Sequence, residues 1–296
     1  MAEETALEHL TLLGVPPPDL VTVAASAGFS AVGLRISPAT DDERPWPVWP
    51  GSPMLAETVL RCADTGIRVL DVEAVRLGPM PSDHGPALEA AAALGARYVN
   101  AIADDPDLGR LSDSFAALTS AAAAYGIRAV VEFMAYRSVR TLAEAVAIAG
   151  RSGGGGVLVD ALHVQRCGVP LAELRAVDPA LIGYVQLCDA PLAAPSGGAT
   201  SADAMREARA GRLLPGDGEL PLGELLAALP DGIPVAVEAP SASASGLASG
   251  LASGGPALFA ARARRALDSV LSVSPQSRSS QLESRSQSRS RSQGRP

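Results

Sequence analysis

Residues 129–160 read AVVEFMAYRSVRTLAEAVAIAGRSGGGGVLVD, and this stretch contains one complete strand–helix–strand repeat. An apolar run ends at Glu132, an Ala- and Glu-rich segment with helical spacing follows at 141–149, and a second apolar run ends at Asp160. Glycines 153–156 predict a turn before the second run. Strands separated by a helix indicate a right-handed crossover between parallel neighbours.

The same alternation extends over most of the chain. A closed (β/α)8 TIM barrel accommodates eight such units in about 270 residues better than an open sheet does. No GxGxxG motif follows the first expected strand, which argues against a dinucleotide-binding fold. The expected strands are 9–13, 31–36, 68–73, 98–101, 129–132, 156–160, 182–186 and 234–238, and the expected helices are 17–27, 54–65, 86–94, 111–125, 141–149, 171–177, 222–229 and 256–271.

The composition is typical of a cytoplasmic globular protein. Hydrophobic residues make up 47% of the 296 residues, so a sizeable core can be buried, while the longest apolar runs are too short to span a membrane. Aromatic residues make up only 3%, which argues against a base-stacking surface for nucleic acid. Acidic Glu3 and Glu4 occupy the positions where a signal peptide would carry positive charge.

All 24 basic residues are arginine. The absence of lysine excludes Schiff-base chemistry, including catalysis with pyridoxal phosphate, and the lysine of a phosphate-binding loop. The three cysteines form no CxxC pair, and the chain has only three histidines. A metal site must therefore depend on carboxylates, which favours Mg²⁺ or Mn²⁺.

The C-terminal segment differs from the rest of the chain. Residues 274–296 are almost entirely Ser, Gln and Arg, with five arginines and one glutamate, whereas residues 1–273 are strongly acidic. Such a segment cannot bury apolar surface, so we expect a single barrel domain at 1–273 followed by a disordered tail. An RNA- or membrane-binding tail is the alternative, but the acidic body offers no basic groove to continue such a contact.

Four consecutive expected strands end in polar residues that can bind a metal. They read AVVE, VLVD, GYVQ and VAVE and end at Glu132, Asp160, Gln186 and Glu238. In a TIM barrel, such residues project into the mouth, where active sites of this fold lie. Any one of them alone could be a helix cap or a loop residue, but four at equivalent places indicate a site for a hard divalent cation.

Residues 10–271 resemble the xylose isomerase-like TIM barrels, also called sugar phosphate isomerases/epimerases. The order and strand-end placement of several short motifs carry the resemblance. These motifs are Ala27-Gly28-Phe29-Ser30-Ala31-Val32-Gly33-Leu34, Val131-Glu132-Phe133, Asp160-Ala161-Leu162-His163, Gln186-Leu187-Cys188-Asp189, Gly216-Asp217-Gly218-Glu219-Leu220 and Val237-Glu238.

The resemblance implies that Glu132, Asp160, Gln186 and Glu238 bind a divalent metal, with Mn²⁺ or Mg²⁺ favoured over Co²⁺ or Zn²⁺. It also implies that Glu132 and Glu238 exchange protons with the substrate. Ketose 3-epimerases carry His where this chain has Gln186, whereas Gln resembles hydroxypyruvate isomerases and some 3-dehydroshikimate dehydratases. The implied chemistry is consistent with a metal that stabilises an enediolate while one glutamate acts as base and the other returns the proton.

Further residues are candidates for substrate contacts or support. His163 follows Asp160 in an Asp-x-x-His pattern and either binds substrate or packs behind the ligands; Arg212 resembles an arginine that contacts metal or substrate anions in relatives. Asp189 either orients a ligand or caps a loop. The ends of earlier expected strands either line the pocket or form a solvated rim, and these residues are Arg35, Glu73 and Asn100.

Three function classes follow. The first is an isomerase or epimerase that acts on a small sugar or hydroxy-keto substrate, and the second is a dehydratase of the 3-dehydroshikimate or inosose type. The third is a non-catalytic barrel that retained its metal ligands. The expected partner is a sugar or keto acid, with no nucleic acid or membrane, and homo-oligomerisation stays open. The scarcity of histidine argues against the multi-zinc DNA-repair endonucleases of the superfamily.

We expect residues 274–296 to be dispensable for folding and metal binding, because their composition cannot support packing. Truncation at Ser274 should leave the thermal midpoint nearly unchanged in a calorimetric scan. A fall of many degrees would show that the tail packs on the barrel.

Overall fold

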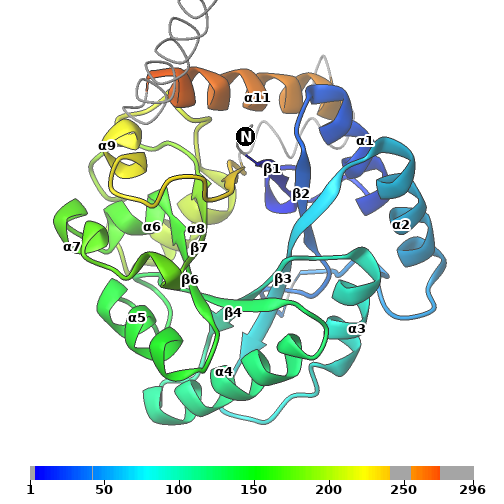
Figure 1. Ribbon diagram of the computed structural model, residues 1–296. Helices are drawn as coiled ribbons and strands as arrows, with labels where there is room; N and C mark the ends of the chain where they lie inside the picture. The colour runs from blue at the N-terminus through cyan, green and yellow to red at the C-terminus, as the bar shows by residue number, and fades with distance from the viewer. Residues whose placement is uncertain (1–3, 42, 241–254, 274–296) are drawn as a thin grey trace, which may run out of the picture.

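The computed structural model describes residues 4–41, 43–240 and 255–273, and these form a closed barrel of parallel strands in the order β1 to β8 (Figure 1). The last strand pairs with the first, because residues 5–7 are in register with residues 235–237. The predicted TIM barrel is confirmed. The strands are β1 (Thr5–Glu8), β2 (Ala31–Arg35), β3 (Arg68–Leu77), β4 (Tyr98–Ala103), β5 (Arg128–Glu132), β6 (Gly156–Asp160), β7 (Ile182–Leu187) and β8 (Val235–Val237).

Helices surround the barrel, and α11 (Gly255–Val273) completes the ring by packing between α1 and α9 (Figure 1). No helix in the described part of the chain is long and apolar enough to cross a membrane. The other helices are α1 (Pro17–Ala27), α2 (Pro53–Thr65), α3 (Gly85–Leu94), α4 (Leu108–Ala123), α5 (Leu142–Arg151), α6 (Ala161–Arg166), α7 (Leu171–Arg175), α8 (Ala202–Ala210) and α9 (Leu222–Leu226), with short 3-10 turns η1 (His9–Leu12) and η2 (Pro179–Leu181).

Local sequence signals explain where the helices begin and end. Helix α5 starts with a capping box, in which Thr141 accepts a hydrogen bond from the Glu144 backbone and the Glu144 side chain accepts one from the Thr141 backbone. Helix α1 has Pro17 at its first position and ends at Gly28, whose φ of 88° is readily adopted only by glycine. The start of α5 and the two ends of α1 are therefore determined by local sequence.

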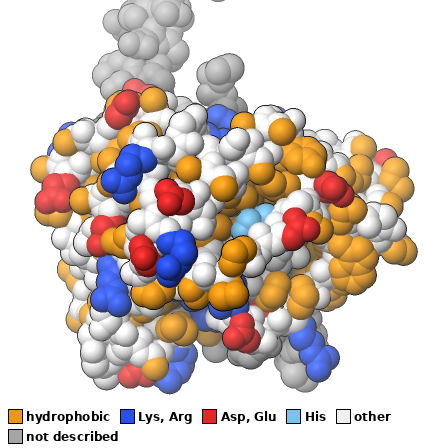
Figure 2. Space-filling view, turned by 90° about the horizontal axis from the view of Figure 1, so that it is seen from below, with side chains coloured by type: hydrophobic (Ala, Val, Ile, Leu, Met, Phe, Trp, Pro, Cys, Tyr) orange, Lys and Arg blue, Asp and Glu red, His pale blue; other side chains and the backbone are white. Residues whose placement is uncertain are grey.

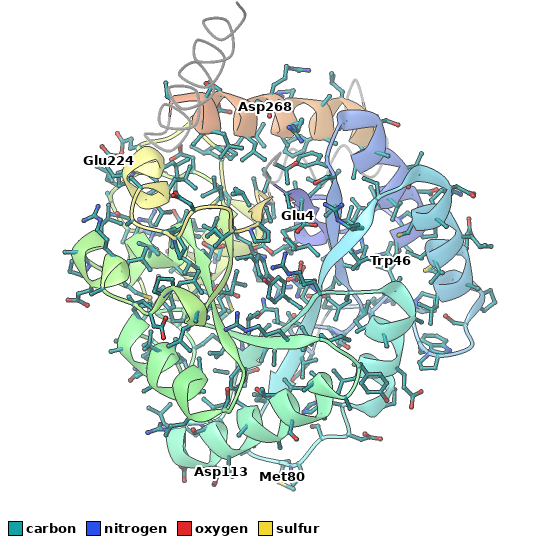
Figure 3. The ribbon with its side chains drawn as sticks, in the orientation of Figure 1. Glu4, Trp46, Met80, Asp113, Glu224 and Asp268 are labelled. Atoms are coloured by element: carbon teal, nitrogen blue, oxygen red, sulfur yellow. The ribbon has the colours of Figure 1, made fainter. Side chains whose placement is uncertain are left out.

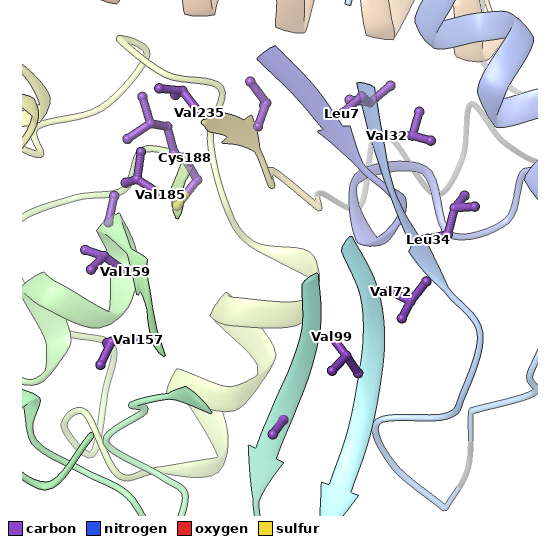
Figure 4. Close-up of a cluster of buried hydrophobic side chains, with 14 of the residues drawn as sticks. Leu7, Val32, Leu34, Val72, Val99, Val157, Val159, Val185, Cys188 and Val235 are labelled. Atoms are coloured by element: carbon purple, nitrogen blue, oxygen red, sulfur yellow. The ribbon is translucent and has the colours of Figure 1, made fainter. Parts of the chain in front are cut away.

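The barrel has an apolar inner layer and an apolar outer face. Outward-facing side chains such as Leu7, Val32 and Val99 belong to the large core between the strands and the helices (Figure 4). One mainly apolar residue from every strand fills the inside of the barrel, with the Tyr98 and Tyr184 rings 5.1 Å apart. This inner layer consists of Ala6, Ala31, Leu70, Tyr98, Val130, Leu158, Tyr184 and Ala236.

The first strand lies earlier than predicted. The expected strand at 9–13 is wrong, because β1 occupies Thr5–Glu8 and His9–Leu12 form the 3-10 turn η1. The ring of His9 accounts for the turn: its Nε2 bonds the Val15 carbonyl (2.8 Å), and its Nδ1 accepts a hydrogen bond from the Arg35 amide (3.2 Å). Because both ring nitrogens of His9 are hydrogen-bonded, the chain leaves the sheet at this residue and forms the turn.

Two helices were not predicted. Helix α6 follows β6 directly, because the Asp160 side chain accepts hydrogen bonds from the backbone of Leu162 and His163 and so caps the helix. Helix α8 lies in the connection from β7 to β8, in which the sequence predicts only the helix at 222–229. The predicted boundary at residue 274 and the tail lie outside the described residues.

The bonds of His9 predict a pH-dependent term in stability. Burial lowers the pKa of His9 from 6.5 to about 4, because only the neutral ring can accept the Arg35 amide. The stabilisation is complete above pH 6.5 and is lost as the pH falls towards 4, a total of about 3 kcal/mol. Replacing His9 by Gln removes the titrating ring and keeps a donor of similar reach.

The measurement is the free energy of unfolding in urea from pH 7 to pH 5 for the wild type and for His9→Gln. Buried carboxyl groups change the stability of both proteins alike, so the difference between the two curves isolates His9. This difference should shrink by about 2 kcal/mol over the interval. A difference that does not change with pH would contradict the assigned tautomer.

Candidate functional site

The strands end within the ring of helices, which Figure 3 shows with its side chains. Parallel strands bring their carboxyl ends to one end of the barrel, so the residues that end them face a common space. In β6 and β7 the register places Asp160 directly beside Gln186. Glu132 ends β5, and Glu238 directly follows β8. All four side chains are buried, as the metal-site prediction requires.

The four predicted ligands do not form a single closed group. Ligand atoms of Glu132, Asp160 and His163 all lie within 4.8 Å of one another. Glu238 instead falls in a second group of carboxylates, and Gln186 Nε2 is 3.5 Å from its Oε1 atom. His163 thus joins two of the predicted ligands, and Gln186 lies beside the fourth.

Arg212 connects the two groups. Its Nη1 atom lies 2.5 Å from Asp160 Oδ2, and its Nη2 atom lies 3.0 Å from Glu238 Oε2. The same guanidinium also donates from Nε to the Ala208 carbonyl at the end of α8 (2.7 Å). Because Arg212 is only 3% exposed, it is a buried cation shared between two strand-end carboxylates.

Burial and charge set the protonation of the site. Burial raises the pKa of Glu132 well above its ordinary value, and the nearby Asp160 and Glu238 raise it further. Burial also raises the pKa of Glu238 to about 8, although Arg212 opposes the shift. For Asp160, burial is outweighed by Arg212 and by hydrogen bonds, so its pKa lies below the ordinary value. Burial lowers the pKa of His163 to about 4, which leaves the ring neutral.

Two unpartnered polar atoms make the residues suitable for a divalent metal. Gln186 Oε1 and His163 Nδ1 are buried and have no hydrogen-bond partner within the described chain. Buried polar groups normally have one, so such orphaned acceptors are consistent with ligand positions. An amide oxygen, a neutral imidazole and two carboxylates form a donor set that suits a divalent cation.

Three further predicted residues, Arg35, Glu73 and Asn100, line a small cavity of about 50 Å³. Arg35 pairs with Glu73 (3.2 Å), and Asn100 donates to Glu132 Oε2 at 3.4 Å. These three residues are buried in the cavity wall and are not a solvated rim. Burial raises the pKa of Glu73 to about 7, against the opposing effect of Arg35. Arg35 Nε and Nη1 have no hydrogen-bond partner in the described part of the chain.

Asp189 supports the loop that carries Arg212. Its Oδ1 accepts hydrogen bonds from the amides of Ala190 and Leu220, and its Oδ2 accepts one from Gly216. The backbone of Asp189 also pairs with Leu213, the residue after Arg212. The contacts of the carboxylate are thus with a loop and not with a predicted metal ligand.

Some residues of the cavity were missed from the sequence. Tyr136 packs edge-on against His163 with ring centroids 5.6 Å apart, and Arg137 and Arg209 also line the cavity. None of them ends a strand, so the strand-end pattern could not find them. Glu8 does end a strand, in the run Thr5-Ala6-Leu7-Glu8, but the misplaced first strand hid this signal.

A larger hollow of about 460 Å³ lies on the outside of the barrel, between the β3–α3 connection and α4. Met80, His84 and Tyr125 line it, and Figure 2 shows a histidine among hydrophobic side chains on this face. Asp83 is the one carboxylate in its lining. This hollow therefore lacks the ligand set of the barrel cavity.

The shared guanidinium predicts a strong effect of Arg212→Met. Removing one partner of a buried ion pair leaves uncompensated charge and should cost about 3–5 kcal/mol in unfolding free energy at pH 7.5. The cost should come mainly from Asp160, because Arg212 helps hold its pKa below the ordinary value, whereas Glu238 has a pKa of about 8 and can take up a proton at pH 7.5. The control is Arg206→Met, since Arg206 lies exposed on α8 and, among the described residues, pairs with Asp203. Equal, small losses in both variants on urea unfolding would contradict this role.

Comparison with known proteins agrees with the geometry. No curated protein sequence matches the chain significantly. A xylose isomerase-like TIM barrel/4-hydroxyphenylpyruvate dioxygenase fusion protein is 20% identical, with a TM-score of 0.73 over 92% of this chain, which spans only 43% of that protein. The IOLI protein with a bound zinc atom is 17% identical, with a TM-score of 0.69 over 91% of this chain and 98% of its own.

The probable 3-DHS dehydratase AsbF, involved in petrobactin synthesis in Bacillus anthracis, is 13% identical, with a TM-score of 0.66 over 90% of this chain and 98% of its own. At these identities the likeness shows the fold alone. The sequence profile of the xylose isomerase-like TIM barrel family matches residues 21–263. The chain therefore belongs to the xylose isomerase-like TIM barrel family.

Proposed function

We propose that this protein is a divalent-metal-dependent isomerase or epimerase of a small sugar or hydroxy-keto substrate. The observation that carries the proposal is the pair Glu132 and Glu238. Both line the same cavity, both are buried, and both have a raised pKa beside potential metal ligands. Two buried carboxyl groups whose pKa values are raised above the ordinary value are suited to take up and release a proton, as a proton transfer at carbon requires.

The residues that would hold the metal are Glu132, Asp160, Gln186 and Glu238, with His163 beside them. A divalent cation supplies stabilisation of the negative charge that develops on a substrate oxygen during proton removal. The orphaned Gln186 Oε1 supports this assignment. Binding at all four residues requires Arg212 to release Asp160 or Glu238, because it occupies an oxygen of each.

The protein's own groups would move the proton. One of Glu132 and Glu238 takes a proton from the carbon beside the substrate carbonyl, and the other returns a proton to the enediolate. Asn100 and Gln186 each offer an amide to one of these carboxylates, and such contacts fix which oxygen faces the cavity. Which glutamate acts first depends on the stereochemistry of the substrate.

Arginine in the cavity wall favours a substrate with an anionic group. Arg35 Nε and Nη1 make no hydrogen bond within the described residues, although Nη1 lies 3.7 Å from Glu43 Oε1, and a guanidinium can bind a carboxylate or phosphate in a bidentate manner. A keto acid or a sugar phosphate fits this wall better than a neutral sugar does. His163 and Asn100 are the proposed partners of substrate hydroxyl or carbonyl oxygens.

A dehydratase is the second candidate. Glutamine at the position of Gln186 is compatible with it, because this residue resembles some 3-dehydroshikimate dehydratases as well as hydroxypyruvate isomerases, and the probable 3-DHS dehydratase AsbF shares the fold. Both reactions begin with the same proton removal. They differ in the next step, where the second carboxyl group assists the departure of water instead of returning a proton to carbon.

The test incubates the protein and Mn²⁺ or Mg²⁺ with a panel of ketoses, hydroxypyruvate and 3-dehydroshikimate. Exchange of a carbon-bound proton with solvent deuterium would indicate isomerisation, whereas new ultraviolet absorbance would indicate a conjugated dehydration product. We expect Glu132→Gln and Glu238→Gln each to lower the rate about 10²- to 10⁴-fold, because an amide cannot act as a base. Both variants should remain folded, since the site lies at the barrel mouth.

Gln186→Ala is the graded control. It removes a neutral ligand and no proton carrier, so we expect weaker metal binding with activity partly restored at saturating Mn²⁺. Near-normal turnover in Glu132→Gln would sink the proton-carrier assignment. Metal binding without exchange or dehydration of any substrate would instead favour the non-catalytic barrel.

A further inference from the structure

A second group of carboxylates lies beside the candidate site, on the β1–β3 side of the barrel. Glu8 of β1 is in register with Gly33 of β2, and Gly33 is in register with Asp71 of β3. A Cβ atom at Gly33 would overlap Glu8 Oε2 and would lie 2.5 Å from Asp71 Oδ1. Glycine at this position therefore leaves the space in which two carboxylates from flanking strands meet.

The polar atoms of this group are buried and unpartnered. Glu8, Asp71 and Tyr184 are each 0% exposed. All four of the carboxylate oxygens on Glu8 and Asp71, and also the Tyr184 hydroxyl and Glu73 Oε1, have no hydrogen-bond partner within the described chain. The Tyr184 phenol and the Glu8 carboxyl group both lie close enough to Asp71 to influence its pKa, so the Glu8 and Asp71 carboxyl groups face each other directly. Two buried carboxyl groups in this arrangement need a shared proton or a cation between them.

The spacing of the oxygens suits a cation. Ligand oxygens of Glu8, Glu73 and Glu238 lie within 4.8 Å of one another. Hard divalent cations bind oxygens at about 2.0–2.6 Å, so one ion can contact three oxygens spaced in this way. Glu73 engages Arg35 through Oε2, which leaves its Oε1 without a hydrogen-bond partner among the described residues, whereas Glu238 engages Arg212 through Oε2 and lies 3.5 Å from Gln186 Nε2 through Oε1.

The balance of buried charge also favours a second ion. Buried carboxyl groups outnumber the two buried guanidinium groups, those of Arg35 and Arg212, that pair with some of them. Arg35 also pairs with Glu43 (3.7 Å), so the arginines alone do not balance the acids. The buried carboxyl groups include Glu8, Asp71, Glu73, Glu132, Asp160 and Glu238.

We propose that Glu8, Glu73 and Glu238, supported by Asp71 and Tyr184, form a second binding site for a hard divalent cation such as Mg²⁺, Mn²⁺ or Ca²⁺. The site is separate from the group of Glu132, Asp160 and His163, and Glu238 lies between the two. It also accounts for glycine at position 33, because any side chain there would overlap the Glu8 and Asp71 carboxylates. Protons shared among the acids are the competing occupant, so cation binding near neutral pH should release protons.

The test measures bound Mn²⁺ per chain in the full-length protein, by titration calorimetry and by elemental analysis after gel filtration. We expect two ions in the wild type, one in Glu8→Gln and one in Asp71→Asn. Asp160→Asn should lose the other ion and retain the one that Glu8→Gln loses, so the double variant Glu8→Gln/Asp160→Asn should bind none. The matched control is Asp113→Asn, an exposed acid on α4, which should still bind two.

The outcomes separate this site from the proposed function. One ion that is lost in Asp160→Asn and retained in Glu8→Gln would overturn the second site and leave the proposed function intact. One ion with the opposite behaviour would support the second site and count against the proposed ligand set. A wild type that binds no Mn²⁺ would overturn the proposal. Unchanged Mn²⁺ binding together with a higher thermal midpoint in Glu8→Gln and Asp71→Asn would also overturn it, and would identify Glu8 and Asp71 as a proton-sharing pair.

Discussion

Arg212 makes the interaction on which the mouth of the barrel depends. A closed parallel barrel collects the polar ends of its strands in one buried space, and in this chain most of those ends are acidic. Their mutual repulsion opposes closure unless cations lie among them. Arg212 joins Asp160 to Glu238, and Arg35 pairs with Glu73 on the other side.

The connection from β7 to β8 positions the Arg212 guanidinium. Helix α8 ends beside Arg212 and accepts its Nε–H through the Ala208 carbonyl. Asp189 then holds the loop after Arg212 through two backbone amides, those of Gly216 and Leu220. A buried guanidinium with fixed contacts on both sides has little freedom to adopt another rotamer. The loop thus acts as part of the site, although it contributes no predicted metal ligand.

The strand-end residues could be predicted from sequence because they combine two strong signals. Apolar runs ending at Glu132, Asp160, Gln186 and Glu238 reveal both a strand and its mouth-facing end. Glu8 carries the same signal. The Leu-rich segment after it, residues 9–13, was predicted to be the first strand instead, so Glu8 was not recognised as a strand end. The turn of His9 depends on its bond to Arg35, which is distant in sequence, so no local pattern could reveal it.

Other features depend on tertiary contacts that no local pattern encodes. The meeting of Glu8 with Asp71 requires the register of three strands, and Arg212 reaches Asp160 across 52 positions of the sequence. Arg137 and Arg209 of the cavity wall come from a loop and from helix α8, with no strand-end signature. Pattern reading therefore finds the residues that each element presents by itself, and it misses those that depend on pairing between elements.

Arginine suits the two buried cationic positions of this interior better than lysine does. A buried lysine loses its proton readily, whereas a guanidinium stays charged in the same surroundings and can bind two carboxylates at once. The acids around Arg35 and Arg212 raise the pKa of both arginines even though burial opposes it. Arginine therefore suits an interior that needs permanent positive charge between carboxylates. Asp160 and Glu238 share the Arg212 guanidinium, which links the end of β6 to the end of β8.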